Sequence, residues 1–492
     1  MSDSSPDLLH AEVLTFDDDA GTVTASSLTA DVPASPPLKV DQLVAVLQAS
    51  PSAESVLIGL IEHTGAAAED GAPPYRLVAI QTCADMPSQL ALVPRVAQLP
   101  MHLAHGTVDY VLSTKAGAGR AVPFWETVLH PLLGFAAQAL TQATEPNRVV
   151  VTESDDSVRE YARGGQHAAD GQPRTTVLLS GDGGVVDLLN SSAPPPPPAE
   201  GEGEAAAPPP TIVLIPLGTG NALFNSLHKP LFTGPSELVL ALRTLLRGVA
   251  APLPTFKASF PPGSRTVKYM SRDHPTSGAG TPGEVAAAEA QLCRQETDVG
   301  ALYGSIVASY GFHASIVYES DTPAYRAHGA ARFGMVAQEL LKTSHHYAAH
   351  VAVRRPGRDG RGLEPIPRGA HAYVLGTLVS NLERTFTISP ASRPLDGQLR
   401  LVHFAPLGPE RTMEAMMKAY DGGKHVESRW DDGQRVYYDD IDELTIRIED
   451  DEERWRKVCI DGTIVDIPKG GTVHVQREEK SRFNIAVDSH VV

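Results

Sequence analysis

The chain reads Val177-Leu178-Leu179-Ser180-Gly181-Asp182-Gly183-Gly184, and further on Ile212-Val213-Leu214-Ile215-Pro216-Leu217-Gly218-Thr219-Gly220-Asn221. Each stretch is a short, branched apolar run that ends at a glycine-rich turn, which is typical of a buried parallel strand. Glycine accepts a positive φ and lets backbone N–H groups come close to an anion. With an aspartate in one turn and Thr-Gly-Asn in the other, the two turns predict a nucleotide phosphate site with a carboxylate beside it.

The composition narrows the class of protein. The net charge of -18 argues against a general nucleic-acid binder, since phosphate neutralisation needs clustered Lys and Arg. The 3 cysteines lie far apart and form neither a metal-ligand spacing nor a disulfide framework, so we expect a reducing compartment. The polar N-terminus is unlike a secretory signal, and no apolar run approaches the ~20 residues of a transmembrane helix. We therefore expect a cytoplasmic protein that touches membranes only peripherally and transiently.

Three domains are expected along the chain. Residues 1–105 alternate short apolar runs with Pro- and Ala-rich turns and are interpreted as a small β-rich module of unknown role. Residues 106–230 follow the alternation of strand, loop and helix that is typical of a parallel α/β sheet. Residues 250–480 are β-rich and predict a second, mainly antiparallel domain, with one helix between 329 and 343. The active site is expected in the cleft between the last two domains.

The individual elements follow from the same patterns. Helices are predicted from about 123 to 143, with a kink at Pro131, over 156–163, and from 185 onward. Strands are predicted over the short branched runs at 56–61, 77–80, 108–113, 149–151, 266–270, 304–309, 349–353, 372–378, 398–403, 444–448 and 472–476.

Two low-complexity stretches interrupt the domains. Residues 191–210 carry consecutive prolines and an acidic Gly-Glu tract, and are predicted to be a disordered Pro-rich insertion. A polyproline-binding partner at 194–210 is a secondary interpretation, because a tolerated loop expansion explains the same composition. The second stretch spans 271–283.

Several motifs occur in the order of a known family. They are Ser113-Thr114-Lys115-Ala116-Gly117-Ala118-Gly119-Arg120-Ala121, Thr152-Glu153, the Ser-Gly-Asp-Gly at 180–183, the Pro-Leu-Gly-Thr-Gly-Asn-Ala at 216–222, Tyr310-Gly311-Phe312, Tyr325 to Phe333, and Ile460-Asp461-Gly462. On these motifs the chain resembles the diacylglycerol kinase catalytic superfamily, which has a fold like that of NAD kinases. Within it the chain looks most like sphingosine and ceramide kinases. The resemblance covers roughly residues 108–476 and leaves the first 105 residues unexplained.

The resemblance implies ATP and Mg²⁺ as cofactors, and it assigns roles to individual residues. Asp182 would orient or deprotonate the acceptor hydroxyl, and Asp187, where the family has a glutamate, would share that role. Nucleotide contacts are expected from Ser113, Lys115, Gly117, Gly119, Arg120, Thr152, Ser180, Gly181, Gly183, Gly218, Thr219, Gly220, Asn221, Arg326, Arg332 and Asp461. No dedicated protein metal site is predicted, because Mg²⁺ is satisfied by one or two carboxylates and phosphate oxygens.

Plainer roles compete with some of these assignments. Lys115 and Arg120 could be solvated loop charges, and Asn221 could cap the following helix. Arg326 and Arg332 could serve only to cap or cover the helix that begins near Gly329.

The match departs from the family at three places. Ser113-Thr114 replaces an Asn-Pro. Sphingosine kinases carry acidic residues at about Ser315 and Val317, one of which recognises the amino-alcohol head, whereas neither is acidic here; Glu319 or Asp321 would have to substitute. Thr463 stands where the family has a glutamate near the nucleotide, which weakens the case for full activity.

The interpretation that follows is an ATP-dependent lipid kinase. It would phosphorylate a primary hydroxyl of a membrane-derived lipid, either a sphingoid base or a diacylglycerol-type lipid. Two alternatives stay open at this point: a catalytically weak or inactive lipid- or nucleotide-binding member of the fold, and a soluble-substrate kinase akin to NAD kinase.

Overall fold

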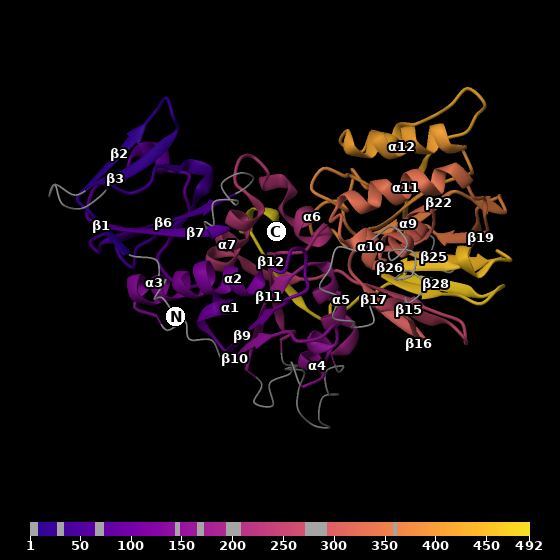
Figure 1. Ribbon diagram of the computed structural model, residues 1–492, viewed down its shortest axis with the longest axis horizontal. Helices are drawn as coiled ribbons and strands as arrows, with labels where there is room; N and C mark the ends of the chain where they lie inside the picture. The colour runs from indigo at the N-terminus through magenta and orange to yellow at the C-terminus, as the bar shows by residue number, and fades with distance from the viewer. Residues whose placement is uncertain are drawn as a thin grey trace, which may run out of the picture. The chain divides into compact units, whose positions relative to one another are not determined.

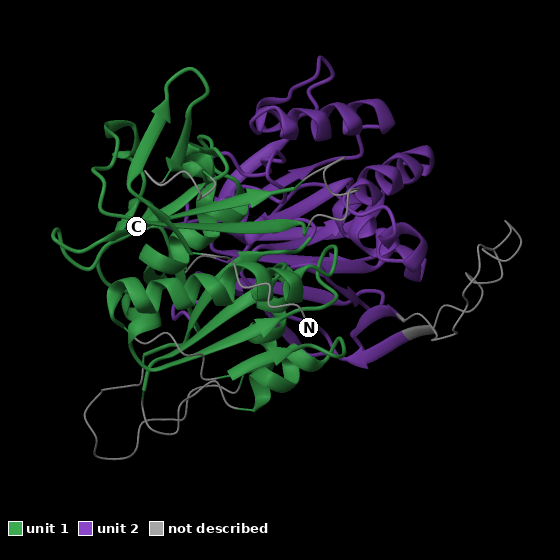
Figure 2. Ribbon diagram, turned by 60° about the vertical axis from the view of Figure 1, so that its left-hand side comes forward, with its two compact units in different colours: residues 1–218, 227–253, 482–492 green, residues 219–226, 254–481 purple. Residues whose placement is uncertain are grey.

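The computed structural model divides into two compact units (Figures 1 and 2). Unit 1 comprises residues 1–218, 227–253 and 482–492, and unit 2 comprises residues 219–226 and 254–481. The structure describes residues 8–26, 34–63, 73–142, 148–164, 172–192, 208–270, 293–357 and 362–492. The core of the predicted Pro-rich insertion, its polyproline motif and the stretch 271–283 lie outside the described residues.

Unit 1 contains the predicted parallel α/β sheet. Its strand order is β10 (Arg148–Val151), β9 (Thr107–Leu112), β11 (Arg174–Ser180), β12 (Thr211–Pro216), β29 (Asn484–Val487) and β13 (Val249–Pro252). All neighbours pair in parallel except β13, which is antiparallel to β29. The parallel core was predicted, and this part of the fold is confirmed. The last strands were not predicted, because β29 comes from the C-terminal end of the chain.

The three helices predicted for unit 1 are observed, one of them in altered form, whereas α1 (Met101–Ala104) and α7 (Glu237–Arg247) were not predicted. The expected helix near 123–143 is observed as α2 (Ala121–Phe124), a π-helical turn η4 (Trp125–Leu129) and α3 (His130–Leu140). Pro131 lies at the start of α3, directly after the π-helical turn, so the irregular turn falls where the proline lacks a backbone donor to the preceding residues. The other two predicted helices are observed as α4 (Ser157–Arg163) and α5 (Asp182–Ser191).

The N-terminal segment is β-rich, as predicted, and is part of unit 1. One sheet has the order β1 (Leu8–Ala11), β7 (Tyr75–Thr82), β6 (Ser55–Glu62), β5 (Leu43–Leu47) and β8 (Arg95–Val96), and a second sheet joins β2 (Val13–Asp17), β3 (Thr22–Ser26) and β4 (Leu38–Lys39). Helices α3 and α7 contact the first sheet. The half-buried Arg243 of α7 donates from Nε and NH2 to the Leu43 carbonyl, at 3.2 and 2.6 Å. These contacts make the segment a packed layer of the unit.

Unit 2 consists mainly of antiparallel sheet, as predicted. One sheet has the order β17 (Ala301–Gly304), β14 (Phe256–Ser259), β28 (Thr472–Arg477), β25 (Glu443–Ile448), β19 (Tyr347–Arg354) and β20 (Glu364–Pro365), with β21 (Ala370–His371) also paired to β19. The other has the order β16 (Cys293–Asp298), β15 (Arg265–Met270), β27 (Thr463–Asp466), β26 (Lys457–Ile460), β18 (Val307–Gly311), β22 (Tyr373–Thr377), β23 (Leu399–Phe404) and β24 (Tyr437–Ile441).

The helices of unit 2 were predicted only in part. The predicted helix is observed as α11 (Ala331–Thr343), which lies beside α12 (Pro409–Tyr420) (Figure 1). Helices α9 (Phe312–Ser320), α10 (Pro323–Arg326) and α12 were not predicted, whereas α6 (Ala222–His228), which begins in unit 2, is the helix expected directly after Asn221. Gly311 marks the change from β18 to α9: its φ is +89°, and a Cβ there would lie 2.6 Å from the Ala372 carbonyl oxygen. The sequence of α9 is rich in β-branched and aromatic residues, and packing against β18 and β26 overrides that preference.

Candidate active site

The loops with the predicted residues in unit 1 share one edge of the parallel sheet. Strands β9, β10, β11 and β12 run in the same direction and end at Leu112, Val151, Ser180 and Pro216. The carboxyl ends of parallel strands form the usual ligand-binding edge of an open α/β sheet. Ladder bonds continue into the loops, since Ser113 N–H donates to the Leu179 carbonyl at 3.0 Å. The sheet therefore places the loops that follow β9, β11 and β12 side by side.

Thr152 fixes the start of the first loop. Its hydroxyl oxygen accepts from the Thr114 N–H at 2.9 Å, and its carbonyl accepts from the Thr114 hydroxyl at 2.8 Å. Thr152 is buried, and its own N–H donates to the Leu112 carbonyl at 3.0 Å. Thr114, which stands where the family has a proline, thus supplies two hydrogen bonds that a proline could not make.

The glycines of the first loop are required by its backbone. Gly117 has φ +53°, and a Cβ there would lie 2.3 Å from the Leu217 carbonyl oxygen. Gly119 has φ +70°, with the Thr114 carbonyl oxygen 3.1 Å from the position of a Cβ. The loop therefore packs backbone to backbone against the turn that follows β12, which only glycine permits.

The two cations of this loop differ in their surroundings. Lys115 Nζ lies 3.3 Å from an oxygen of Asp155, and both side chains are largely exposed. Such a pair contributes little to stability and breaks easily. Arg120 is exposed directly before α2, and no ion pair to it is seen within the described ranges. Both cations can therefore turn toward an incoming anion without losing a strong contact.

Asp182 begins α5, and only Gly181 separates it from the end of β11. Gly181 is the N-cap, so the half-buried Asp182 lies in the first turn, where the positive end of the helix dipole favours a carboxylate. A Cβ on Gly184 would lie 2.8 Å from the Ser180 hydroxyl oxygen, so strand and helix pack closely there. Gly183 is exposed, and apart from its own turn of helix a Cβ on it would meet no atom of the described residues within 4 Å. Among these residues, the first turn of α5 is thus open beside Asp182.

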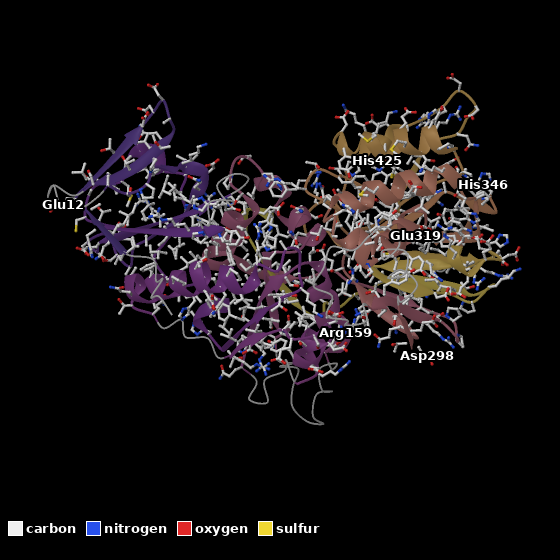
Figure 3. All side chains as sticks on the ribbon, in the orientation of Figure 1. Glu12, Arg159, Asp298, Glu319, His346 and His425 are labelled. Atoms are coloured by element: carbon white, nitrogen blue, oxygen red, sulfur yellow. The ribbon has the colours of Figure 1, made fainter. Side chains whose placement is uncertain are left out.

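Asp187 lies further along α5 and is engaged by a cation. Arg159 of α4, labelled in Figure 3, donates from Nε to an Asp187 oxygen at 2.7 Å and from NH1 to Asp156 at 3.2 Å. The Asp187 side chain is mostly buried in this pair. The pair joins α4 to α5, which is a structural role that the sequence did not indicate. A catalytic role for Asp187 stays a prediction.

The second glycine turn lies at the boundary of the two units. Gly218 closes this part of unit 1, and unit 2 takes up the chain at Thr219, which is exposed. Asn221 is buried and has φ +51°, a left-handed conformation that Asn adopts more readily than most residues. In α6, the Asn225 side-chain amide donates to the Gly220 carbonyl at 2.9 Å. Asn225 thus helps to hold the turn, and no motif had singled it out.

Two arginines of unit 2 have unequal partners. Arg326 makes a two-pronged ion pair with Asp321, at 2.9 and 2.7 Å. Arg332 is half-buried, lies 4.8 Å over the Phe333 ring, and has an Nε with no hydrogen-bond partner among the described residues. Burial lowers the pKa of Arg332, and the positive charge of Arg326 adds to that effect while Asp321 opposes it. Arg332 is therefore the better candidate to meet a phosphate.

Asp461 binds the backbone of its own unit. Its carboxylate accepts from three successive N–H groups, those of Ser305 at 2.6 Å, Ile306 at 3.0 Å and Val307 at 2.6 Å. This bend separates β17 from β18, so the single strand predicted over 304–309 is wrong. The nucleotide contact expected of Asp461 stays a prediction, but the carboxylate already has a structural task.

The geometry defines a class of site before any comparison: an α/β domain with glycine loops and an aspartate at the carboxyl edge of a parallel sheet, an arrangement that suits an anionic ligand. Residues 129–258 match the family described as the diacylglycerol kinase catalytic domain. This match confirms the predicted resemblance to the diacylglycerol kinase catalytic superfamily, a family of kinases that take ATP as phosphate donor. The narrower likeness to sphingosine and ceramide kinases stays a prediction.

Comparison with solved structures found similar proteins, whereas comparison with curated protein sequences found none. A diacylglycerol kinase from Bacillus anthracis str. Sterne is similar with TM-score 0.44 and 14% identity, over 79% of this chain and 99% of that one. A candidate diacylglycerol kinase of the same organism gives TM-score 0.47 and 15% identity, over 79% of this chain and 97% of that one. No curated protein matches the chain. Among the described residues, no helix has both the length and the apolar character needed to cross a bilayer.

Proposed function

We propose that this protein is an ATP-dependent lipid kinase that transfers the γ-phosphoryl group to a primary hydroxyl of a membrane-derived lipid. The observation that carries the proposal is the position of Asp182, at the first turn of α5 beside the open space over Gly183. A carboxylate in that place can accept the proton of an attacking hydroxyl. The family match over residues 129–258 supplies the reaction class.

The phosphates would be bound by backbone and by cations. Gly181 and Gly183 stand at the start of α5, where unpaired N–H groups favour an anion. Gly117 and Gly119 hold the neighbouring loop in a left-handed conformation that directs further backbone toward the same edge. Lys115, Arg120 and Arg332 are the proposed charges that neutralise the transferred group.

Mg²⁺ fits the donor chemistry of this edge without a dedicated cage. The described residues contain no group of three or more His, Cys, Asp or Glu side chains that could hold a metal on their own. Mg²⁺ needs only one or two carboxylates when phosphate oxygens and waters complete its shell. Asp182 is the proposed carboxylate, and the ion would offset charge on the phosphates.

The acceptor is proposed to have a neutral head group, as a diacylglycerol-type lipid has. In the sphingosine kinases that this chain resembles, acidic residues at about Ser315 and Val317 meet the amine. Here the Ser315 hydroxyl accepts from the Tyr347 phenol at 2.9 Å. The two candidate substitutes are already paired: Glu319 (labelled in Figure 3) with Arg454 at 2.7 and 2.9 Å, and Asp321 with Arg326. A sphingoid amine would have to break one of these pairs.

The test is transfer of radiolabel from ATP to a panel of diacylglycerol, a sphingoid base, ceramide and NAD, with the lipids in vesicles or detergent. The proposal expects label in a lipid, with diacylglycerol above the sphingoid base. Asp182→Asn should abolish transfer, while Asp431→Asn, a change in an exposed aspartate of unit 2, should not. Equal transfer by wild type and Asp182→Asn would overturn the role of Asp182.

One observation favours a second candidate, a nucleotide-binding protein with little or no kinase activity. The late motif carries Thr463 where the family has a glutamate, and Asp461 beside it is taken up by three backbone donors. Saturable ATP binding without transfer to any member of the panel would support this candidate. Transfer to NAD alone, with no need for a lipid phase, would instead support a soluble-substrate kinase. The proposed location is the cytoplasm with transient membrane contact.

A further inference from the structure

Two guanidinium groups share one tyrosine ring at an edge of unit 2. Tyr437 opens β24, the last strand of its sheet, and lies opposite His403 of β23. The Arg368 guanidinium lies 4.7 Å from the centroid of the Tyr437 ring, and the Arg435 guanidinium lies 4.3 Å from it. His403 stacks on the same ring, with centroids 4.9 Å apart and planes inclined by 7°. Three nitrogen-rich groups thus surround a single aromatic side chain.

These positive charges have no carboxylate counterpart in the described part of the chain. Neither Arg368 nor Arg435 forms an ion pair there, although the protein as a whole has a net charge of -18. Arg429 adds a third charge: it pairs with Arg435 across an isolated antiparallel bridge, which directs the two side chains to the same face. Like charges placed opposite each other destabilise a sheet. The positive charges of Arg429 and Arg435 therefore repel each other, and a bound anion would reduce that repulsion.

The carboxylate of Asp439, which lies beside His403, serves other residues. An Asp439 oxygen lies 3.6 Å from NH2 of Arg355 and 3.8 Å from Nε2 of His403. Arg355 also donates to Glu364 at 2.6 Å. Asp439 is consequently shared between an arginine and a histidine and leaves Arg368 and Arg435 uncompensated.

The floor of the cluster is buried and polar. Arg368 NH2 lies 3.2 Å from Nδ1 of the buried His403. His371, fully buried nearby, has two ring nitrogens without a hydrogen-bond partner among the described residues. Burial lowers the pKa of both histidines and the charge of Arg368 lowers it further, while Asp439 opposes the shift at His403. A lowered pKa favours the neutral ring, and such a polar floor under uncompensated arginines suits an anion better than a cation.

We infer that Arg368 and Arg435, which lie over the Tyr437 ring, and Arg429, which lies opposite Arg435, form a binding site for a phosphate group. Arginine recognises phosphate through paired N–H donors, and stacking on an aromatic ring fixes the guanidinium plane while leaving its edge free. The phosphate could be presented by an anionic phospholipid or as a free ion, since the chemistry is the same. This site lies apart in sequence from every residue proposed to act in phosphoryl transfer, and it does not depend on the proposed function.

The experiment uses the full chain and two probes: inorganic phosphate in solution, and phosphatidylcholine vesicles with or without phosphatidic acid. Binding is measured for wild type, the double variant Arg368→Gln/Arg435→Gln and the single variant Arg429→Gln. Arg393→Gln, at another exposed arginine of unit 2, is the matched control. The non-hydrolysable ATP analogue is kept saturating throughout, so that the nucleotide site is filled and does not contribute.

The site predicts that the double variant loses binding by more than about tenfold, the change expected when charge-assisted hydrogen bonds are removed, and that the control does not. Arg429 is exposed, so Arg429→Gln tests the site without risk to folding and should also weaken binding. Loss with vesicles alone would identify a lipid head group, and loss with both probes a free phosphate. Unchanged binding in both Arg429→Gln and the double variant would overturn the inference.

Discussion

Replacing Asp461 by asparagine should destabilise unit 2 without altering its backbone. Asp461 has φ +46°, a conformation that asparagine tolerates as well as aspartate, so the substitution isolates the carboxylate. In Asp461→Asn, the remaining carbonyl oxygen can still accept from Ile306 and Val307, while the new NH₂ group faces the buried N–H of Ser305. Losing one hydrogen bond to a charged group and burying an unsatisfied donor costs about 3 kcal/mol.

The assay is urea unfolding followed by tryptophan fluorescence, with Asp431→Asn as a matched control for loss of a charge. Trp455 precedes β26 and reports on the same unit. We expect the unfolding free energy of Asp461→Asn to fall by about 3 kcal/mol and that of the control by less than about 0.5 kcal/mol. Equal stability of both variants, together with a raised KM for ATP in Asp461→Asn alone, would refute the structural role and restore the nucleotide contact.

Three further predictions concern unit 1 and the buried histidines. Gly183→Ala should stabilise α5 by about 0.5 kcal/mol, because no neighbour meets the new Cβ, and yet raise the KM for ATP; an unchanged KM would mean that no ligand approaches this face. Asp187→Asn and Arg159→Met should each lower the unfolding free energy by about 1 kcal/mol and leave kcat within about twofold, whereas a collapse of kcat in Asp187→Asn alone would support a catalytic role. Unfolding free energy should decrease as pH falls from 6.5 toward 4, because burial lowers the pKa of several histidines to about 3 or 4, so the unfolded state binds more protons in that window. At pH 5 each should contribute a loss of about 2 kcal/mol, and a stability curve that is flat between pH 7 and 5 would contradict this. The histidines are His102, His371 and His425.

The parallel core of unit 1 could be predicted because its signals are local. The strands are short runs of branched residues, β11 and β12 lead into glycine-rich turns, and the parallel arrangement follows from the alternation with helices. The position of Asp182 follows from the same logic, since only Gly181 separates it from the end of β11. The glycines Gly117 and Gly119 have the positive φ values that their predicted role requires.

What the sequence missed depends on contacts between distant segments. Strand β29 comes from the C-terminal end of the chain and joins the sheet of unit 1. No local sequence pattern predicts that pairing. Helix α9 has the composition of a strand and becomes a helix only through its packing on β18 and β26. The bend at Ser305 exists because Asp461, remote in sequence, supplies the acceptor for it. The ion pair between Arg159 and Asp187 could not be predicted either, because it joins residues of two different helices.

The central claim is that Asp182 enables transfer of the γ-phosphoryl group from ATP to a lipid hydroxyl. The most direct measurement is single-turnover transfer of radiolabel from ATP to diacylglycerol in vesicles, compared between wild type and Asp182→Asn, with ATP affinity measured separately. The account predicts a loss of transfer between about 10²- and 10⁴-fold in Asp182→Asn while ATP still binds. Transfer by the variant at the wild-type rate, or none from the wild type to any lipid, would contradict it.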